Sequence, residues 1–243
     1  MKLDELLLDS GNDVPFEAAG VTIHVPTLKE IAYIGEKSFL MGCHFLLFDK
    51  NNLEIEDKSG LENQSNFNIF MSVMNSSDRA IHKTDAMMVL TLLFPNYKVE
   101  IEHDKILLQL ENFSSSINEY NFEDFKKVIA QIFCLDSSES EEFNPSDALA
   151  KRIAEKIKKG REARNKTKDS ENVKMNIYSR YISILSVGLP LDKNLLYNYT
   201  VYQLKDEFDR FQMKMNSDIY LKAKLAGAQD LEEVENWMED IHS

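Results

Sequence analysis

Apolar and polar positions near the start of the chain predict a short strand and then a capped helix. Residues Val21–Val25 alternate and are rich in β-branched side chains, which predicts a strand paired with residues 15–18. Thr27 and Glu30 follow at the spacing of a capping box, in which the hydroxyl and the carboxylate bind the free backbone amides of a helix start. Gly35 is expected to end this helix.

Three further segments carry apolar residues at helical spacing and are expected to form a helical core: residues 37–48, 67–74 and 84–94. The third should stop before Pro95, because the residue before a proline avoids the helical region. Strand-like runs at 97–102 and 105–110 predict a two-stranded hairpin. A last helix, capped by Asn121, is expected to reach residue 133.

The charge of the chain changes sharply after residue 135. Residues 136–147 (DSSESEEFNPSD) are acidic and serine-rich, which is typical of a linker. Between residues 148 and 174 the sign inverts, with ten lysines and arginines against four acids. We therefore expect a charged linker with a basic helix over residues 136–174.

A second helical region is expected from about residue 175. Its first helix should carry one apolar face: Ile177, Tyr181, Ile184 and Leu185. Thr200 and Gln203 form a second capping box, which begins the longest helix, and Gly227 should end it. Apolar residues along that helix predict a seam that faces a partner helix: Val201, Leu204, Phe208, Phe211, Met215 and Ile219. A short final helix is expected after Asp230, with these apolar positions: Leu231, Val234, Trp237, Met238 and Ile241.

These elements predict an α+β fold that is mainly α-helical. A helical N-terminal domain with short β-hairpins is expected over residues 1–135. The charged linker and basic helix follow over residues 136–174, and a small all-helical region occupies residues 175–243.

The composition indicates a folded intracellular protein. The 243 residues include 14 Phe, 9 Tyr and 10 Met, too many for a disordered chain. A net charge of -13 repels phosphate backbones and anionic lipids, so protein is the expected class of partner and nucleic acid is disfavoured. The longest apolar run is too short to cross a membrane, and acidic residues near the N-terminus oppose a secretion signal. We expect a cytoplasmic location.

Motifs of catalysis or metal binding are absent from the sequence, including phosphate-binding glycine loops and paired metal-ligand histidines. Cys43 and Cys134 lie far apart, outside any zinc-type cluster, and are expected to be buried thiols. Cys43 and His44 are neighbours, but adjacent helix residues point about 100° apart and cannot form a nucleophile–base pair. His24 and the other histidines are expected at surface or satisfied core positions. The sequence predicts no enzyme, no cofactor and no metal.

Two sets of residues are candidate protein-binding positions. The basic helix contributes Lys151, Arg152, Lys158 and Arg161, and the C-terminal helices contribute Phe208, Phe211, Trp237 and Met238. Three interpretations of the basic run stay open: a helix that is solvated or paired within the protein, a protein-binding surface, or a nucleic-acid contact. Because only three helices follow the linker, their core is thin, and part of their apolar surface is a candidate docking site for another chain.

Two segments, Val25–Glu36 (VPTLKEIAYIGE) and Ala226–His242, resemble tail-region proteins of phages and prophages of Gram-positive bacteria, most nearly the tail assembly chaperones. The resemblance implies a folded N-terminal domain with a C-terminal extension, which this family often adds by translational frameshifting. It also implies that the protein coats or escorts the tape-measure protein while tail-tube subunits assemble. Functional residues of the family are not carried over, because the resemblance lies in end segments and not in a defined site.

The leading hypothesis is a non-enzymatic protein-binding factor in phage tail morphogenesis, located in the host cytoplasm. Its partners would be a protein client, such as the tape-measure protein, or sister subunits in a homo-oligomer. One alternative is a structural protein of the tail or baseplate that stays in the virion. A second alternative is a nucleic-acid-binding regulator that acts through the basic helix at residues 151–168.

Overall fold

The computed structural model describes residues 2–50, 64–76, 81–135, 176–227 and 236–238. Of these residues, 59% are helical and 13% lie in strands, which form two small antiparallel sheets. The predicted α+β, mainly α fold is therefore confirmed. The predicted linker and basic helix, residues 136–174, lie outside the described residues, so the division of the chain into domains stays a prediction.

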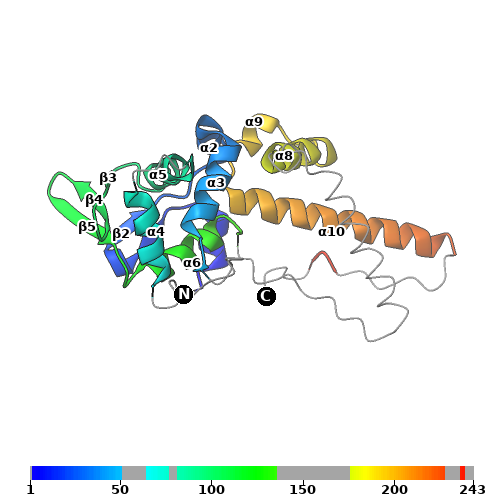
Figure 1. The fold of residues 1–243 in the computed structure, drawn as a ribbon. Coiled ribbons are helices and arrows are strands. Elements are labelled where there is room, and N and C mark those ends of the chain that lie inside the picture. The colour runs from blue at the N-terminus through cyan, green and yellow to red at the C-terminus, as the bar shows by residue number, and fades with distance from the viewer. Residues whose placement is uncertain (1, 51–63, 77–80, 136–175, 228–235, 239–243) are drawn as a thin grey trace, which may run out of the picture.

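Figure 1 shows the arrangement of the elements, with the three-stranded sheet at one end and the long helix α10 extending from the other. The helices are α1 (Glu5–Ser10), α2 (Leu28–Ile34), α3 (Glu36–Leu46), α4 (Asn66–Asn75), α5 (Ile81–Leu93), α6 (Phe122–Ile132), α8 (Ile177–Gly188), α9 (Lys193–Leu196) and α10 (Val201–Leu225), with a short 3₁₀ turn η1 (Glu17–Ala19). The strands are β1 (Val14–Phe16), β2 (Val21–Ile23), β3 (Lys98–Ile101), β4 (Ile106–Leu110) and β5 (Phe113–Ile117).

The capped helix forms as predicted, and the first hairpin forms with its first strand shifted: β1 spans Val14–Phe16, and residues 17–18 of the predicted partner lie in η1. Strands β1 and β2 pair antiparallel with Val14 opposite Ile23. The capping box is complete: the Thr27 hydroxyl accepts from the Glu30 amide, and the Glu30 carboxylate accepts from the Thr27 amide at 2.8 Å. Gly35 follows the helix with φ 88°, a conformation that favours glycine, and the helix ends there.

The predicted two-stranded hairpin is wrong in its number of strands. Strands β3, β4 and β5 form a three-stranded antiparallel sheet, in which Leu110 pairs with Phe113 across a two-residue turn. Strand β5 (FSSSI) has three consecutive serines and no apolar alternation, and its turn has no glycine, so the usual signals of a hairpin are missing. Burial of Ile117 and a hydrogen bond from the Ser115 hydroxyl to the Ala19 carbonyl hold the strand in place.

Asn121 precedes helix α6 as predicted, but its side chain does not cap the helix. Its Oδ1 accepts from the Asn118 amide at 2.8 Å, and its Nδ2 donates to the carbonyls of Ser116 and Ala18. The buried Asn121 therefore joins the end of β5 to the turn η1. A side chain can satisfy either a helix amide or a distant carbonyl, and sequence spacing alone does not distinguish the two.

A cluster of phenylalanines fills the centre of the molecule. Seven of them are essentially inaccessible: Phe16, Phe39, Phe70, Phe94, Phe122, Phe125 and Phe133. Helices α3 and α5 cross closely beside this cluster because Gly42 has no side chain at the crossing. A Cβ atom at Gly42 would lie 2.5 Å from the Asp85 carbonyl oxygen and 2.6 Å from a methyl carbon of Val89.

The described C-terminal helices share one hydrophobic core with the N-terminal elements. Ile182, Leu185 and Leu204 are buried in the same cluster as the phenylalanines. A backbone bridge joins Thr27 to Thr200, and the amide of Leu28 donates to the carbonyl of Tyr199 at 2.8 Å. The base of α10 is thus bonded to the start of α2.

Helix α10 begins at the predicted capping box of Thr200 and Gln203 and has 25 residues, which corresponds to about 37 Å at 1.5 Å per residue. Residues 226–227 follow it, with Gly227 at φ 86°.

In α8 the predicted apolar face is wrong at Ile184, which is exposed, because the helix is turned so that Ile182 and Leu185 enter the core. Among the described residues, no helix combines the length and apolar character that a membrane span requires.

The close crossing of α3 and α5 makes Gly42 sensitive to a single added methyl group. Glycine to alanine in an open helix position usually stabilises by up to about 1 kcal/mol, but the contact with the Asp85 carbonyl should reverse the sign. We expect Gly42→Ala to lower the free energy of unfolding by about 3 kcal/mol in urea titrations. Lys37→Ala, at an exposed position of α3, should stay within about 0.5 kcal/mol of the wild type. A Gly42→Ala variant as stable as the wild type would contradict the packing described.

Candidate functional site: the distal half of helix α10

The half of α10 nearer the body, residues 201–211, packs against α8 and the core. Val201, Tyr202 and Leu204 are buried. Phe208 is half-buried and stacks on Tyr181 of α8, with ring centroids 3.8 Å apart and ring planes 11° from parallel. This half of the predicted seam therefore faces a partner helix of the same chain.

Phe211 completes the contact between α10 and α8. A Cβ atom at Gly188, the last residue of α8, would lie 2.3 Å from the ring of Phe211. Glycine at that position leaves room for the ring. The predicted seam is packed as far as Phe211, and its remaining members extend beyond α8.

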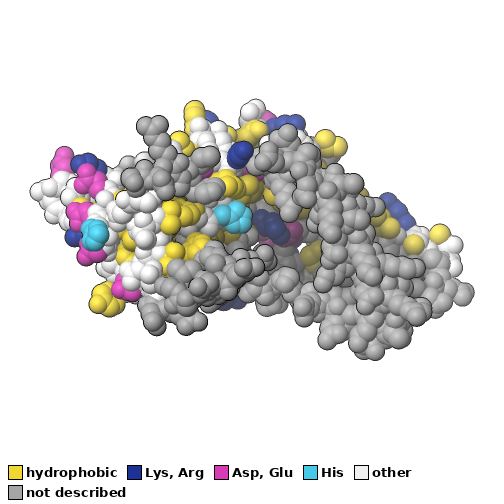
Figure 2. All heavy atoms as spheres, in the orientation of Figure 1, with side chains coloured by type: hydrophobic (Ala, Val, Ile, Leu, Met, Phe, Trp, Pro, Cys, Tyr) yellow, Lys and Arg dark blue, Asp and Glu magenta, His cyan; other side chains and the backbone are white. Residues whose placement is uncertain are grey.

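The distal half of α10, residues 212–225, carries apolar side chains that are exposed, whereas the apolar side chains of the half nearer the body are buried or half-buried. Met215 is 45% exposed and Ile219 is 59% exposed, although they continue the line of Phe208 and Phe211. We call Met215 and Ile219 the Met215 face. In Figure 2 apolar and basic atoms lie together toward the far end of this helix.

A second exposed apolar pair lies on another side of the distal half. Leu221 is 52% exposed and Leu225 is 88% exposed. They share a side of the helix with Lys214, because residues 214, 218, 221 and 225 are separated by steps of four, three and four. We call Lys214, Leu221 and Leu225 the Leu221 face. Ile219 and Leu221, two residues apart, point about 160° away from each other, so the two faces are separate.

The distal half is basic, unlike the chain as a whole. Lys214, Lys222 and Lys224 stand against the single acid Asp218, which gives a net charge of +2 over residues 212–225. Lys222 and Lys224 lie in the last turn of α10, where positive charge interacts favourably with the helix dipole. A partner of this surface would therefore combine apolar side chains with acidic ones.

The predicted binding residues fall into three groups. Phe208 and Phe211 are largely occupied by α8, and the basic residues Lys151, Arg152, Lys158 and Arg161 lie outside the described ranges. Trp237 and Met238 are described and lie in a turn, where a helix was predicted, with Met238 71% exposed. The Trp237 ring lies near α10, with its centroid 5.8 Å from the Lys214 Nζ.

Leu221 and Leu225 are exposed on α10 but are not among the residues predicted from the sequence. They lie outside the seam of steps from Val201 to Ile219, so the seam pattern gives no reason to select them. Two leucines four residues apart on an otherwise polar stretch of helix are the signal that could have identified them.

A polar cluster near β2 is the arrangement most similar to catalytic chemistry. His24 Nδ1 lies 2.8 Å from the Asp13 carboxylate and His24 Nε2 lies 3.1 Å from the Glu30 carboxylate. The sequence predicts no partner for His24, because Asp13 and Glu30 are 11 and 6 residues away on other elements. Glu30 also accepts from the Thr27 hydroxyl at 2.7 Å, so both carboxylates serve to bind the start of α2 to the first hairpin.

The chemistry of this cluster favours a structural role. Both ring nitrogens of His24 lie within hydrogen-bond distance of carboxylates of the same chain, so the ring is held between two elements of the fold. Cys43 is buried, and this burial raises the pKa of its thiol far above the usual range, so it is protonated and unreactive. His44, next to it in sequence, is exposed, and Cys134 is half-buried and not fully buried as expected. Within the described ranges, no group of side chains is arranged to hold a metal ion.

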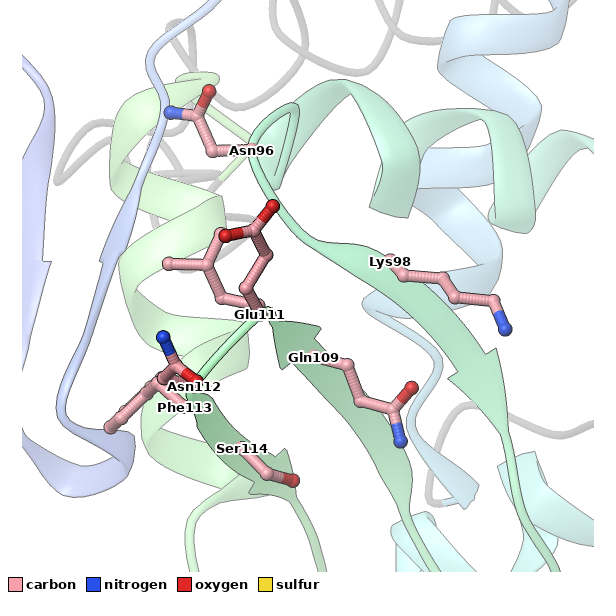
Figure 3. A pocket seen from close by; sticks show the side chains of 8 residues that line it. Asn96, Lys98, Gln109, Glu111, Asn112, Phe113 and Ser114 are labelled. Atoms are coloured by element: carbon pink, nitrogen blue, oxygen red, sulfur yellow. The ribbon is translucent and has the colours of Figure 1, made fainter.

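An open groove runs along the β3–β5 sheet, with a volume of about 1150 Å³. It is lined by Asn96, Lys98, Gln109, Leu110, Glu111, Asn112, Phe113 and Ser114. Figure 3 shows that these polar side chains are spread along the strands and the turn and do not converge on one point. A small-molecule site usually presents convergent polar groups in a concave apolar pocket, which this groove lacks.

Residues 166–242 match the family model described as YomV second domain. This family is associated with phages and prophages, which is consistent with a phage protein and does not identify a tail assembly chaperone. The match includes α8, α9, α10 and the turn with Trp237, so it covers the whole candidate surface. No curated protein and no solved structure matches the chain.

The two halves of α10 should respond differently to truncation of one apolar side chain. Phe208→Ala removes the stacking on Tyr181 and half-buried apolar area, so we expect the free energy of unfolding to fall by about 2 kcal/mol. Ile219→Ala removes an exposed side chain and should change it by less than about 0.5 kcal/mol. Urea unfolding followed by circular dichroism measures both. Equal losses would mean that the distal half is packed as firmly as the proximal half.

Acid should weaken the fold in part through Glu30. Burial alone would raise the pKa of Glu30, but hydrogen bonds from Thr27 and His24 outweigh it and hold the pKa below its ordinary value of 4.5. The stability due to this carboxylate is therefore present above pH 4.5 and is lost as the pH falls through the lower folded-state pKa.

Glu30→Gln tests this, because glutamine keeps the capping geometry and removes the charge. The variant should lose less stability than the wild type when urea unfolding is repeated at decreasing pH below 4.5. The control is Glu111→Gln in the exposed turn between β4 and β5, which should follow the wild type. Identical pH profiles for Glu30→Gln and the wild type would count against the role of this carboxylate.

Proposed function

We propose that this chain is a non-enzymatic protein-binding factor of a phage, which uses the Met215 face of α10 to hold an elongated helical client during tail morphogenesis. The tape-measure protein is the proposed client. The observation that carries the proposal is the exposure of Met215 and Ile219 on a helix whose base is anchored in the core. The phage association of the matching family supports the setting.

The geometry of α10 suits a helical client. Phe208, Phe211, Met215 and Ile219 form one line of apolar residues, and a helix recognises another helix through such a line. Since α8 occupies the line only as far as Phe211, an incoming helix could continue the packing from there. Held at its base and exposed at its far end, α10 is a rigid element that presents this surface at little entropic cost.

The size of the Met215 face indicates moderate affinity for a single contact. Full burial of a side chain of this kind contributes about 1.5–3 kcal/mol, and both residues are already about half covered, so the pair would supply about 2–3 kcal/mol. That corresponds to about a hundredfold in the dissociation constant. Several copies arrayed along one long client would raise the overall affinity without any new contact.

Co-purification tests the proposal directly. The full chain would be co-expressed with the tape-measure protein of the same phage, and the expected result is a stable complex. Met215→Gln/Ile219→Gln should weaken that complex about a hundredfold, since glutamine preserves helix propensity and removes the apolar contact. Val187→Gln, at an exposed apolar position of α8, is the matched control and should bind as the wild type does.

Mass spectrometry of purified virions distinguishes the proposal from a structural role. A protein that acts only during assembly should be absent from finished particles. Its presence in stoichiometric amount would favour a structural tail or baseplate protein instead. Failure of the wild type to bind the tape-measure protein at any concentration tested would reject the proposed client.

A further inference from the structure

The Leu221 face of α10 is apolar and exposed like the Met215 face, but one described contact indicates what lies against it. The Trp237 ring lies over Lys214, with 5.8 Å between the Lys214 Nζ and the ring centroid. This is within the distance at which a lysine and an indole ring attract each other. Trp237 is the single tryptophan of the chain, and it is 36% exposed, less than its neighbour Met238 at 71%.

The charge of the segment around Trp237 complements the distal half of α10. Residues 228–243 contain six acids and no lysine or arginine, which gives a net charge of -6. Residues 212–225 carry +2. Opposite charge on two neighbouring segments favours their association and sets their orientation.

The segment of residues 228–243 carries apolar residues between its acids, and residues 237–238 form a turn. Its apolar residues recur at steps of three, three, one and three: Leu231, Val234, Trp237, Met238 and Ile241. Such a segment has the chemistry that would cover Leu221 and Leu225, while its acids would lie toward the lysines.

The segment after Gly227 is long enough for Trp237 to lie beside Lys214. Lys214 is eleven residues before Leu225, which is about 16 Å along the helix. Trp237 is ten residues after Gly227, which spans about 15 Å even if those residues were helical. The left-handed conformation of Gly227, φ 86°, stands where the chain must reverse direction.

We propose that residues 228–243 bind back along the Leu221 face of α10, with Trp237 as the anchor beside Lys214. This contact occupies Leu221 and Leu225 within the same chain and leaves the Met215 face free. The contact itself does not depend on the client, whereas its consequence, that a client meets only the Met215 face, rests on the proposed function.

Tryptophan fluorescence of the full-length protein tests the contact, because the single indole reports only on residue 237. In the wild type the emission should be blue-shifted relative to the urea-unfolded chain and protected from quenching by acrylamide. Leu221→Gln/Leu225→Gln should shift the emission to the red and remove the protection. Met215→Gln/Ile219→Gln carries the same kind of change on the other face and should leave both signals as in the wild type.

Three results would overturn the inference. The first is a wild-type emission equal to that of the unfolded chain, and the second is an emission that Leu221→Gln/Leu225→Gln does not alter while circular dichroism shows the helix intact. The third is a wild-type emission that depends on protein concentration, which would assign the Leu221 face to a second copy. A wild-type protein that fails to bind the tape-measure protein but keeps its blue-shifted, protected emission would reject the proposed client and leave this contact standing.

Discussion

Two helix starts are bonded to each other in this protein, and the position of the long helix depends on that junction. Thr27 and Thr200 each begin a helix with a complete capping box, and their backbones form an antiparallel bridge. The amide of Leu28 also donates to the carbonyl of Tyr199, which uses a donor that a helix start would otherwise leave free. Because both caps are satisfied locally and joined across 173 positions of sequence, α10 leaves the body in a defined direction.

Contacts with α8 and the core then determine how many residues of α10 are packed. Leu204 is buried, Phe208 stacks on Tyr181 and Phe211 fills the space beside Gly188, and beyond that point α8 ends. The remaining turns of α10 have no described helix beside them, so their apolar side chains stay partly in water. A helix with such an anchored base and exposed end loses little conformational freedom when it binds a partner. The distal half is therefore well suited to be a binding surface.

Charged groups near the junction act as supports for the fold. The carboxylates of Asp13 and Glu30 bind opposite sides of the His24 ring, and Asp13 also accepts from the Val25 amide at 3.1 Å. These bonds connect the first hairpin to α2, and α2 in turn is bonded to the base of α10. The histidine and the two carboxylates therefore stabilise this corner of the fold.

The sequence by itself determined the parts of this protein that depend on neighbouring residues. Local hydrogen bonds and backbone angles explain the capping boxes at Thr27 and Thr200, the end of α2 at Gly35 and the end of α5 before Pro95. Each of these features involves residues within a few positions of each other, so it can be recognised in the sequence. The apolar line of α10 was visible for the same reason, and it identified a helix with a surface that could face a partner.

Only the tertiary structure decided which of those surfaces are covered. Strand β5 is rich in serine and forms because it pairs with β4 and is bonded to η1. The Asn121 side chain donates to carbonyls of β5 and η1 instead of capping its own helix. His24 gains two carboxylates from separate elements, and α8 ends so that Phe211 is packed while Met215 is not. These outcomes depend on contacts between residues far apart in sequence, whose energies exceed local preferences and leave no periodic trace in the chain.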